Sequence, residues 1–286
     1  MTEVRIENGY GSVTLSGTGA GVIGLTGIDG LGLPEVTLNT ATFTGQEGRV
    51  TLSSSRNARV VTLSGDIKWR DVDRTVRQMM KILSVPVTVT FTVGNRKRKI
   101  EARCTSFDPP FGRARYKSFA MQLESDSPYL SDVQETVTAV YTRENLLPFD
   151  YGSYFGSTKK AISRLTHSNT VTNGGDVRSE PVITIANTGG TTAKTDGITV
   201  KNETTGQKIT LNYATKAGET VTVDIPNRAI YNEEGTNLIN VLSDDSYLSD
   251  FWLEEGGNLL SCTTNGVGET VAVHCRFYNQ YLEVMG

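Results

Sequence analysis

The stretch Ile23-Gly-Leu-Thr-Gly-Ile-Asp-Gly-Leu-Gly-Leu-Pro-Glu-Val-Thr-Leu-Asn-Thr40 decides how this chain folds. It mixes apolar residues with glycines, reaches Pro34 and then alternates apolar with polar residues. Each ordered glycine costs roughly 0.5–1 kcal/mol relative to alanine, so a folded chain sustains such a stretch only where neighbours hold a bent backbone. The stretch is no catalytic motif, and it predicts short, bent strands.

The composition bounds the class of protein. The chain has 286 residues and a formal net charge of −3, so we expect two domains and no general attraction to nucleic acid or anionic membranes. Glycine supplies 29 of the 286 residues, above the ~7% that is typical, which favours many tight turns. No run reaches the about 20 apolar residues of a membrane helix, and the first residues carry no secretory signal. We expect a protein made and assembled in a cytoplasm.

The first half reads as β-structure around one helix. Short alternating segments recur between turn residues, at a spacing that favours a sandwich or barrel: Val4–Glu7, Val36–Leu38, Val50–Leu52 and Val60–Leu63. The exception is Asp71–Leu83, where apolar residues follow the helical period and Asp71 suits the N-cap. The expected apolar stripe comprises Val72, Val76, Met79, Met80 and Leu83. Pro86 ends this helix.

A long hairpin follows the helix, from Val87–Val93 to Arg98–Phe107 through Gly94-Asn95. Basic residues gather at its tip and along one arm: Arg96, Lys97, Arg98, Lys99 and Arg103. Three interpretations stay open, namely charge that protects a strand edge, charge at a protein interface, and a phosphate-binding patch. Edge protection is the commonest use of such residues, and nucleic acid is the weakest of the three interpretations.

The second half reads as β-structure throughout. Clean alternation marks Pro181–Ile185, Ile198–Lys201, Lys208–Leu211 and Val221–Ile225, so we expect a second β-sandwich. Between the halves, the stretch from Arg143 to about Gly156 reads as a docked linker. Trp252 and Tyr247 are candidate sugar or partner contacts, although packing in a core or an interface is the commoner fate of such rings.

No pattern predicts catalysis, a metal site or a cofactor. Gly17-Thr-Gly-Ala-Gly21 departs from the dinucleotide and P-loop patterns, and its glycines suit turns. A zinc site needs three or four cysteine or histidine ligands at defined spacings, but the only two histidines are His167 and His274, and His274 and its neighbour Cys275 would point to opposite faces of a strand. The pairs Asp244-Asp245 and Glu254-Glu255 diverge on neighbouring residues, whereas glycosidase carboxylates converge across a cleft.

The three cysteines form no dense disulfide framework. Cys104 lies on an arm of the long hairpin. Cys262 and Cys275 flank an expected second hairpin whose strands would let them face each other, and we favour two reduced thiols because of the expected compartment.

Three patches together resemble the distal tail proteins of siphophages, components of the phage tail baseplate or tail-tip hub. They are the opening Ile23–Ile67, the helix with its hairpin at 71–107, and a third set in the second half. That third set comprises Asn173–Pro181, Ile198–Leu211, Val223–Arg228 and Phe251–Asn258. One departure is Gly256-Gly257, where the family often shows Pro-Gly.

The resemblance implies a mainly β protein of two β-sandwich domains. A tail-tube-like, ring-forming domain over 1–142, with one helix and the long hairpin, is followed by a linker over 143–172 and a galectin-like β-sandwich over 173–286. The protein would be structural and not an enzyme, without cofactor or metal, and would lie at the tail tip of the virion after assembly in the bacterial host cytoplasm. It would form a hexameric ring that joins the tail tube to the baseplate.

The implied partners are the tail tube protein, a tail-associated lysin-type hub protein and a receptor-binding protein, with no specific nucleic acid and no membrane insertion. The candidate subunit-interface residues lie on the long hairpin: Phe91, Arg96, Lys97, Arg98, Lys99 and Arg103. The alternative function is that of a carbohydrate-binding cell-surface adhesion module.

Overall fold

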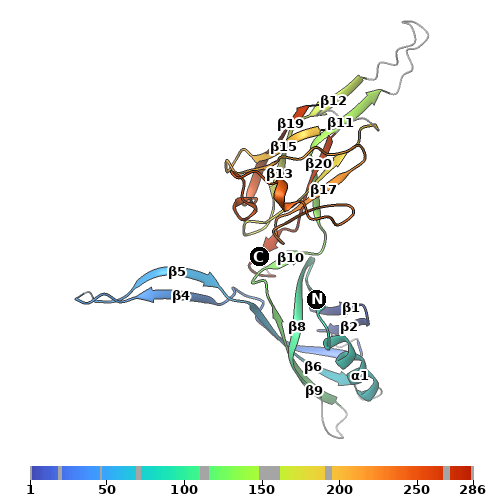
Figure 1. Ribbon diagram of the computed structural model, residues 1–286. Helices are drawn as coiled ribbons and strands as arrows, with labels where there is room; N and C mark the ends of the chain where they lie inside the picture. The colour runs from blue at the N-terminus through green and yellow to red at the C-terminus, as the bar shows by residue number, and fades with distance from the viewer. Residues whose placement is uncertain are drawn as a thin grey trace. The chain divides into compact units, whose positions relative to one another are not determined.

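The computed structural model describes residues 2–18, 21–45, 47–68, 72–109, 116–147, 162–190, 195–266 and 271–284. The chain divides into two compact units (Figure 1). The first unit comprises Met1–Val133 and Gln280–Gly286, and the second comprises Gln134–Asn279. In the described residues the fold is mainly β with one α-helix, which confirms the predicted fold class.

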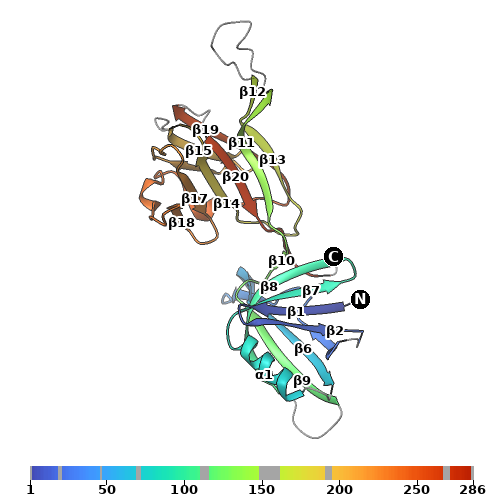
Figure 2. The ribbon, with the colours of Figure 1, turned by 90° about the vertical axis from the view of Figure 1, so that its right-hand side faces the viewer.

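A nine-stranded sheet forms the first unit (Figure 2). Its strands are, in chain order, β1 (Thr2–Asn8), β2 (Gly11–Ser16), β3 (Ile23–Asp29), β6 (Arg59–Lys68), β7 (Val87–Val93), β8 (Arg96–Asp108), β9 (Tyr116–Ser125), β10 (Leu130–Asp132) and β21 (Gln280–Tyr281). The spatial order is β21-β10-β8-β7-β1-β2-β3-β6-β9. The predicted long hairpin is therefore confirmed as β7–β8, joined by a turn at Gly94 with φ +62°.

The sheet curls until it closes on β8. This strand pairs with β7 through Arg96–Ala102 and with β9 through Arg103–Asp108. Such closure removes the open edges that would invite aggregation. Because alternate residues of each strand point inward, the enclosed core fills with apolar side chains of every strand, for example Val61, Leu63 and Ile67 of β6.

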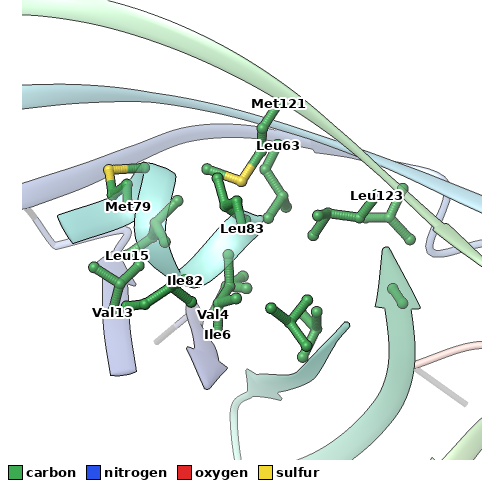
Figure 3. Packing of buried hydrophobic residues seen from close by; sticks show 14 of the residues in the cluster. Val4, Ile6, Val13, Leu15, Leu63, Met79, Ile82, Leu83, Met121 and Leu123 are labelled. Atoms are coloured by element: carbon green, nitrogen blue, oxygen red, sulfur yellow. The ribbon is translucent and has the colours of Figure 1, made fainter. Parts of the chain in front are cut away.

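The helix α1 (Val72–Leu83) covers this core (Figure 3). Met79, Ile82 and Leu83 pack toward residues of β1 and β2, which include Ile6 and Leu15. Met80, which we expected on the apolar stripe, is 46% exposed. With 3.6 residues per turn it lies about 100° around the helix from Met79, so Ile82 takes its place. The predicted N-cap Asp71 lies outside the described residues.

A separate two-stranded ribbon belongs to the first unit. Strands β4 (Val36–Ala41) and β5 (Val50–Arg56) pair with each other and with no other described strand. We call residues 36–56 the arm. The strand Val36–Leu38 follows the glycine-rich stretch as predicted, but it does not join the main sheet.

Two sheets form the second unit and enclose a second apolar core. The six-stranded sheet has the order β12-β11-β20-β14-β17-β18, and the four-stranded sheet has the order β13-β19-β15-β16. Their bounds are β11 (Thr136–Leu147), β12 (Ile162–Thr166), β13 (Ser168–Asn173), β14 (Val182–Asn187), β15 (Thr195–Asn202), β16 (Lys208–Leu211), β17 (Thr220–Asp224), β18 (Ala229–Asn232), β19 (Gly256–Gly266) and β20 (Val271–Phe277). Two short 3₁₀ turns, η3 (Ile239–Val241) and η4 (Leu248–Asp250), precede β19.

The observed units divide the chain at other residues than the expected domains. Strand β11, most of which we placed at the end of the first domain, pairs with β20 in the second unit. Strands β12 and β13 lie in the expected linker 143–172, yet they pair with β11 and β19. The segment 148–161 lies outside the described residues. The last residues, from Gln280, return to the first unit.

The expected hairpin around Cys262 and Cys275 is wrong. Their strands β19 and β20 belong to different sheets of the second unit, so the two strands are not hydrogen-bonded neighbours. Both cysteines are free thiols buried in the second core, in agreement with the favoured reading of two reduced thiols.

Candidate assembly surfaces

The arm carries a group of exposed apolar side chains. All seven residues of β5 are exposed, and in Figure 1 the ribbon stands clear of the nine-stranded sheet. Within the arm the exposed fractions are Val36 49%, Leu38 47%, Phe43 55%, Val50 39% and Leu52 61%, and Leu33, just before the arm, is 79% exposed. An isolated two-stranded ribbon is marginally stable in water, and contiguous exposed apolar surface marks interaction sites. The arm is therefore the strongest candidate for an assembly surface in the described part of the chain.

The register of the arm places apolar side chains on a common face. Val36 lies opposite Arg56 and Leu38 opposite Ser54, so both apolar residues share a face of the ribbon. Leu52 is the extra residue where the register shifts between Asn39 and Thr40. A bulge of this kind strengthens the local twist and re-aims side chains. Each strand keeps one unpaired edge, which is available to a further strand or loop.

Hydrogen bonds fix the root of the arm. The Asn57 amide donates to the Glu35 carbonyl at 2.9 Å, and the Thr37 hydroxyl donates to the Asn57 side-chain oxygen at 2.8 Å. Arg56 donates to the Tyr129 hydroxyl at 3.1 Å and lies over its ring. The base of the ribbon is thus tied to the body of the first unit, while its strands remain in solvent.

The basic residues of the hairpin β7–β8 have different surroundings. Arg96, Lys97 and Arg103 are exposed, and Lys99 is half-buried. Arg98 instead donates to Asp132 at 2.6 Å, and its guanidinium stacks 3.5 Å from the centre of the Tyr281 ring. Arg98 therefore holds the last described strand, β21, in place, and only the other basic residues remain as surface candidates.

Phe91 does not belong to this surface. Its side chain is 0% exposed and packs in the core of the first unit, because inward and outward positions alternate along β7. The expectation that Phe91 contacts a neighbouring subunit is thus corrected: it is a core residue.

Trp252 and Tyr247 have different surroundings. The guanidinium of Arg178 lies 4.6 Å from the Trp252 ring centre, and the indole N–H donates to Glu254 at 2.6 Å. Arg178 thus covers one face of the ring, which leaves less of it for a sugar to stack on. Tyr247 is 61% exposed and remains a candidate contact for a partner.

The described residues offer no group of three or more His, Cys, Asp or Glu that could hold a metal ion. Among the described helices, none is long and apolar enough to cross a membrane.

The two buried thiols predict a pH dependence of stability. Burial raises the pKa of Cys262 and of Cys275 to about 12, from an ordinary 9.0. The stabilisation by the neutral thiols is full below pH 9 and is lost as the pH rises from about 9 toward 12, because only the unfolded chain then ionises. Each thiol contributes a slope of up to about 1.4 kcal/mol per pH unit. Denaturant unfolding at pH 8 and pH 10 measures this fall in the free energy of unfolding. In a Cys275→Val variant the fall is expected to be smaller than in the wild type. An equal fall in the two proteins contradicts the prediction.

The described residues thus form a β-rich fold with an exposed apolar ribbon that pairs with no other described strand. Residues 174–281 match the family model of the siphovirus-type tail component, C-terminal domain. The chain is also similar to solved structures at low identity. One is "Crystal Structure of SPP1 Dit (gp 19.1) Protein, a Paradigm of Hub Adsorption Apparatus in Gram-positive Infecting Phages", with 14% identity and a TM-score of 0.64 over 91% of this chain and 93% of that chain.

A second is "Structure of the Phage P2 Baseplate in its Activated Conformation with Ca", with 11% identity and a TM-score of 0.52 over 96% of this chain and 98% of that chain. No curated protein matches the chain. The predicted resemblance to siphophage distal tail proteins is thus confirmed: residues 174–281 match the family model of the C-terminal domain of the siphovirus-type tail component, and the fold is similar to that of SPP1 Dit.

Proposed function

We propose that this protein is a structural hub of a phage tail tip. Copies of the chain form a hexameric ring that joins the tail tube to the baseplate. The similarity to SPP1 Dit, whose structure is described as a hub adsorption apparatus, supports this role. Under this proposal the chain works by holding other subunits, not as an enzyme, and it uses no cofactor. It is located in the virion tail and is assembled in the host cytoplasm.

The observation that carries the proposal is the arm. Its exposed valines and leucines, with Phe43 at its end, cost free energy in water, and burying one such side chain contributes about 1.5–3 kcal/mol. A ring is the natural way to cover this surface, because each copy donates its arm to the next and a repeated heterologous contact closes when the rotation is right.

The second unit is the platform for further partners in this proposal. A galectin-like sandwich faces outward from the ring and docks a receptor-binding protein, and the first unit stacks on the tail tube protein and on a tail-associated lysin-type hub protein. The exposed cations Arg96, Lys97 and Arg103 set the register of these contacts by charge complementarity.

A double substitution on the arm tests the ring. Leu38→Asp with Leu52→Asp places two carboxylates on exposed positions, so the fold is unaffected but the arm no longer docks. We expect mass photometry to show rings for the wild type and monomers for the variant, with the thermal midpoint shifted by no more than about 2 °C.

The matched control is Leu259→Asp, since this leucine is 42% exposed on the second unit. It is expected to leave the ring intact. A wild-type chain that stays monomeric alone and with the tail tube protein of the same particle, or a double variant that still forms rings, contradicts the proposal.

A further inference from the structure

Among the described residues of the first unit, Arg59 is the most deeply buried charged side chain, at 2% exposure. It lies at the start of β6, three residues after the end of the arm at Arg56. Among the described residues, its guanidinium donates only to backbone carbonyls. The distances are 2.7 Å to Gly30, 2.8 Å to Gly32, 2.8 Å to Pro128 and 2.7 Å to Leu282. Four of the five N–H donors of this side chain are thereby used.

The carbonyls come from segments far apart in the chain. Gly30 and Gly32 lie in the connection that leads from β3 into the arm. Pro128 precedes β10. Leu282 belongs to the last described segment, Gln280–Val284, which we call the return segment. One guanidinium therefore holds the root of the arm and the return segment together.

The return segment anchors the second unit from one side. It follows Asn279, the last residue of that unit, so the second unit is joined to the first at both of its ends. In the first unit, Tyr281 pairs with Leu130 in the β10–β21 ladder, and its hydroxyl donates to Asp132 at 3.1 Å. Val284 is 1% exposed in the first core. One of the two connections to the second unit is thus held by a short strand, one buried side chain and Arg59.

We propose that Arg59 couples the arm to the return segment, so that docking of the arm on a neighbouring copy tightens the anchor of the second unit. The coupling within one chain stands on the contacts above, and its use on docking rests on the proposed ring. The guanidinium is a rigid planar fork, so moving the carbonyls on one side reorients the donors on the other. A buried charged donor that loses its acceptor is costly, which makes the two sets of bonds interdependent.

Hydrogen exchange of the full chain measures the coupling in the monomer. Arg59→Lys keeps the charge but replaces the fork by an ammonium with three donors, which cannot reach the four carbonyls together. We expect exchange to accelerate about tenfold both at the Asn57 amide, which closes the arm root, and in the return segment. Strand β14 in the second unit serves as the internal reference and stays unchanged.

The matched control is Arg56→Lys. Arg56 is exposed and bonds only the Tyr129 hydroxyl through its side chain in the described structure, so the return segment is expected to keep its exchange rate. Acceleration confined to one of the two segments, or a uniform acceleration over the whole chain, overturns the coupling.

The variant Tyr281→Ala tests the same coupling by perturbing the return segment. It replaces Arg59→Lys in the experiment if that variant fails to fold. It removes the bond to Asp132 and the stack with Arg98, and so loosens the return segment. The coupling predicts faster exchange at Asn57 as well. A loosened return segment beside an unchanged Asn57 amide overturns it.

The last step compares assembled and unassembled chains. In wild-type rings, the return segment is expected to exchange several-fold more slowly than in the monomeric variant with Leu38→Asp and Leu52→Asp. With Arg59→Lys, rings form but this slowing disappears, and slowing that persists overturns the use of the coupling on docking. Should the wild type form no rings, the proposed function fails, whereas the two monomer measurements still decide whether Arg59 couples the segments.

Discussion

Replacing Phe91 with alanine is expected to lower the free energy of unfolding of the first unit by about 3–5 kcal/mol. The ring is 0% exposed and belongs to the cluster formed by the closed sheet and α1. Its removal forfeits the transfer free energy of a phenyl group and leaves a cavity that the paired strands β7 and β8 cannot collapse to fill. Denaturant unfolding of the full chain, followed by hydrogen exchange of β7, assigns the loss to this unit.

Phe43→Ala is the matched control, since the same atoms are removed from a ring that is 55% exposed at the end of the arm. It is expected to change the stability of the monomer by less than about 0.5 kcal/mol and to weaken the ring instead. If Phe91→Ala left the stability intact and weakened the ring, the interface interpretation of Phe91 would return. The pair thus separates a residue of the core from a residue of the assembly surface.

Local patterns predicted the elements that depend on local physics. The helical period over Asp71–Leu83 and Pro86 after it gave α1 almost to the residue, and Gly94-Asn95 gave the turn of the hairpin β7–β8. These signals work because a helix stripe and a tight turn are set by neighbours in sequence. The mainly β class followed from the glycines and the short alternating segments.

Local sequence patterns did not predict which strands lie in which sheet. Val36–Leu38 alternates in the same way as Val60–Leu63, yet the first strand lies in the exposed arm and the second in the closed sheet. Alternation states only that a strand has two faces and not what covers them. For the same reason Cys262 and Cys275 looked like neighbours on a hairpin, although their strands joined opposite sheets.

The candidate site shows the same limit at the level of single side chains. The basic tip was visible in sequence, but that Arg98 is committed to Asp132 and Tyr281 depends on the return of the last residues to the first unit. No sequence pattern indicated the role of Arg59, because its hydrogen-bond acceptors are backbone carbonyls, which every residue has. One pattern in the sequence could have indicated the arm. The strand that contains Ser53-Ser54-Ser55 has too few apolar residues to be buried on both faces.

Gly30→Ala is expected to destabilise the first unit by about 2–5 kcal/mol, because it strains the backbone and disturbs a buried hydrogen bond together. Gly30 has φ +89°, a conformation that L side chains rarely adopt. A Cβ there would lie 2.0 Å from the Val60 carbonyl oxygen, which is backbone and cannot rotate away. The clash is relieved only if the end of β3 moves away from β6. This movement displaces the Gly30 carbonyl from the Arg59 guanidinium.

Gly45→Ala is the matched control for Gly30→Ala. Gly45 has φ +85°, nearly the same conformation, but an added Cβ would meet nothing within 4 Å. It is expected to cost only about 1 kcal/mol of backbone strain, and within the arm rather than in the core. The difference between the two variants in denaturant unfolding isolates the steric contact at the root of the arm. Equal effects would mean that strain alone acts at Gly30, and that the close approach of β3, Val60 and Arg59 does not hold the arm in place.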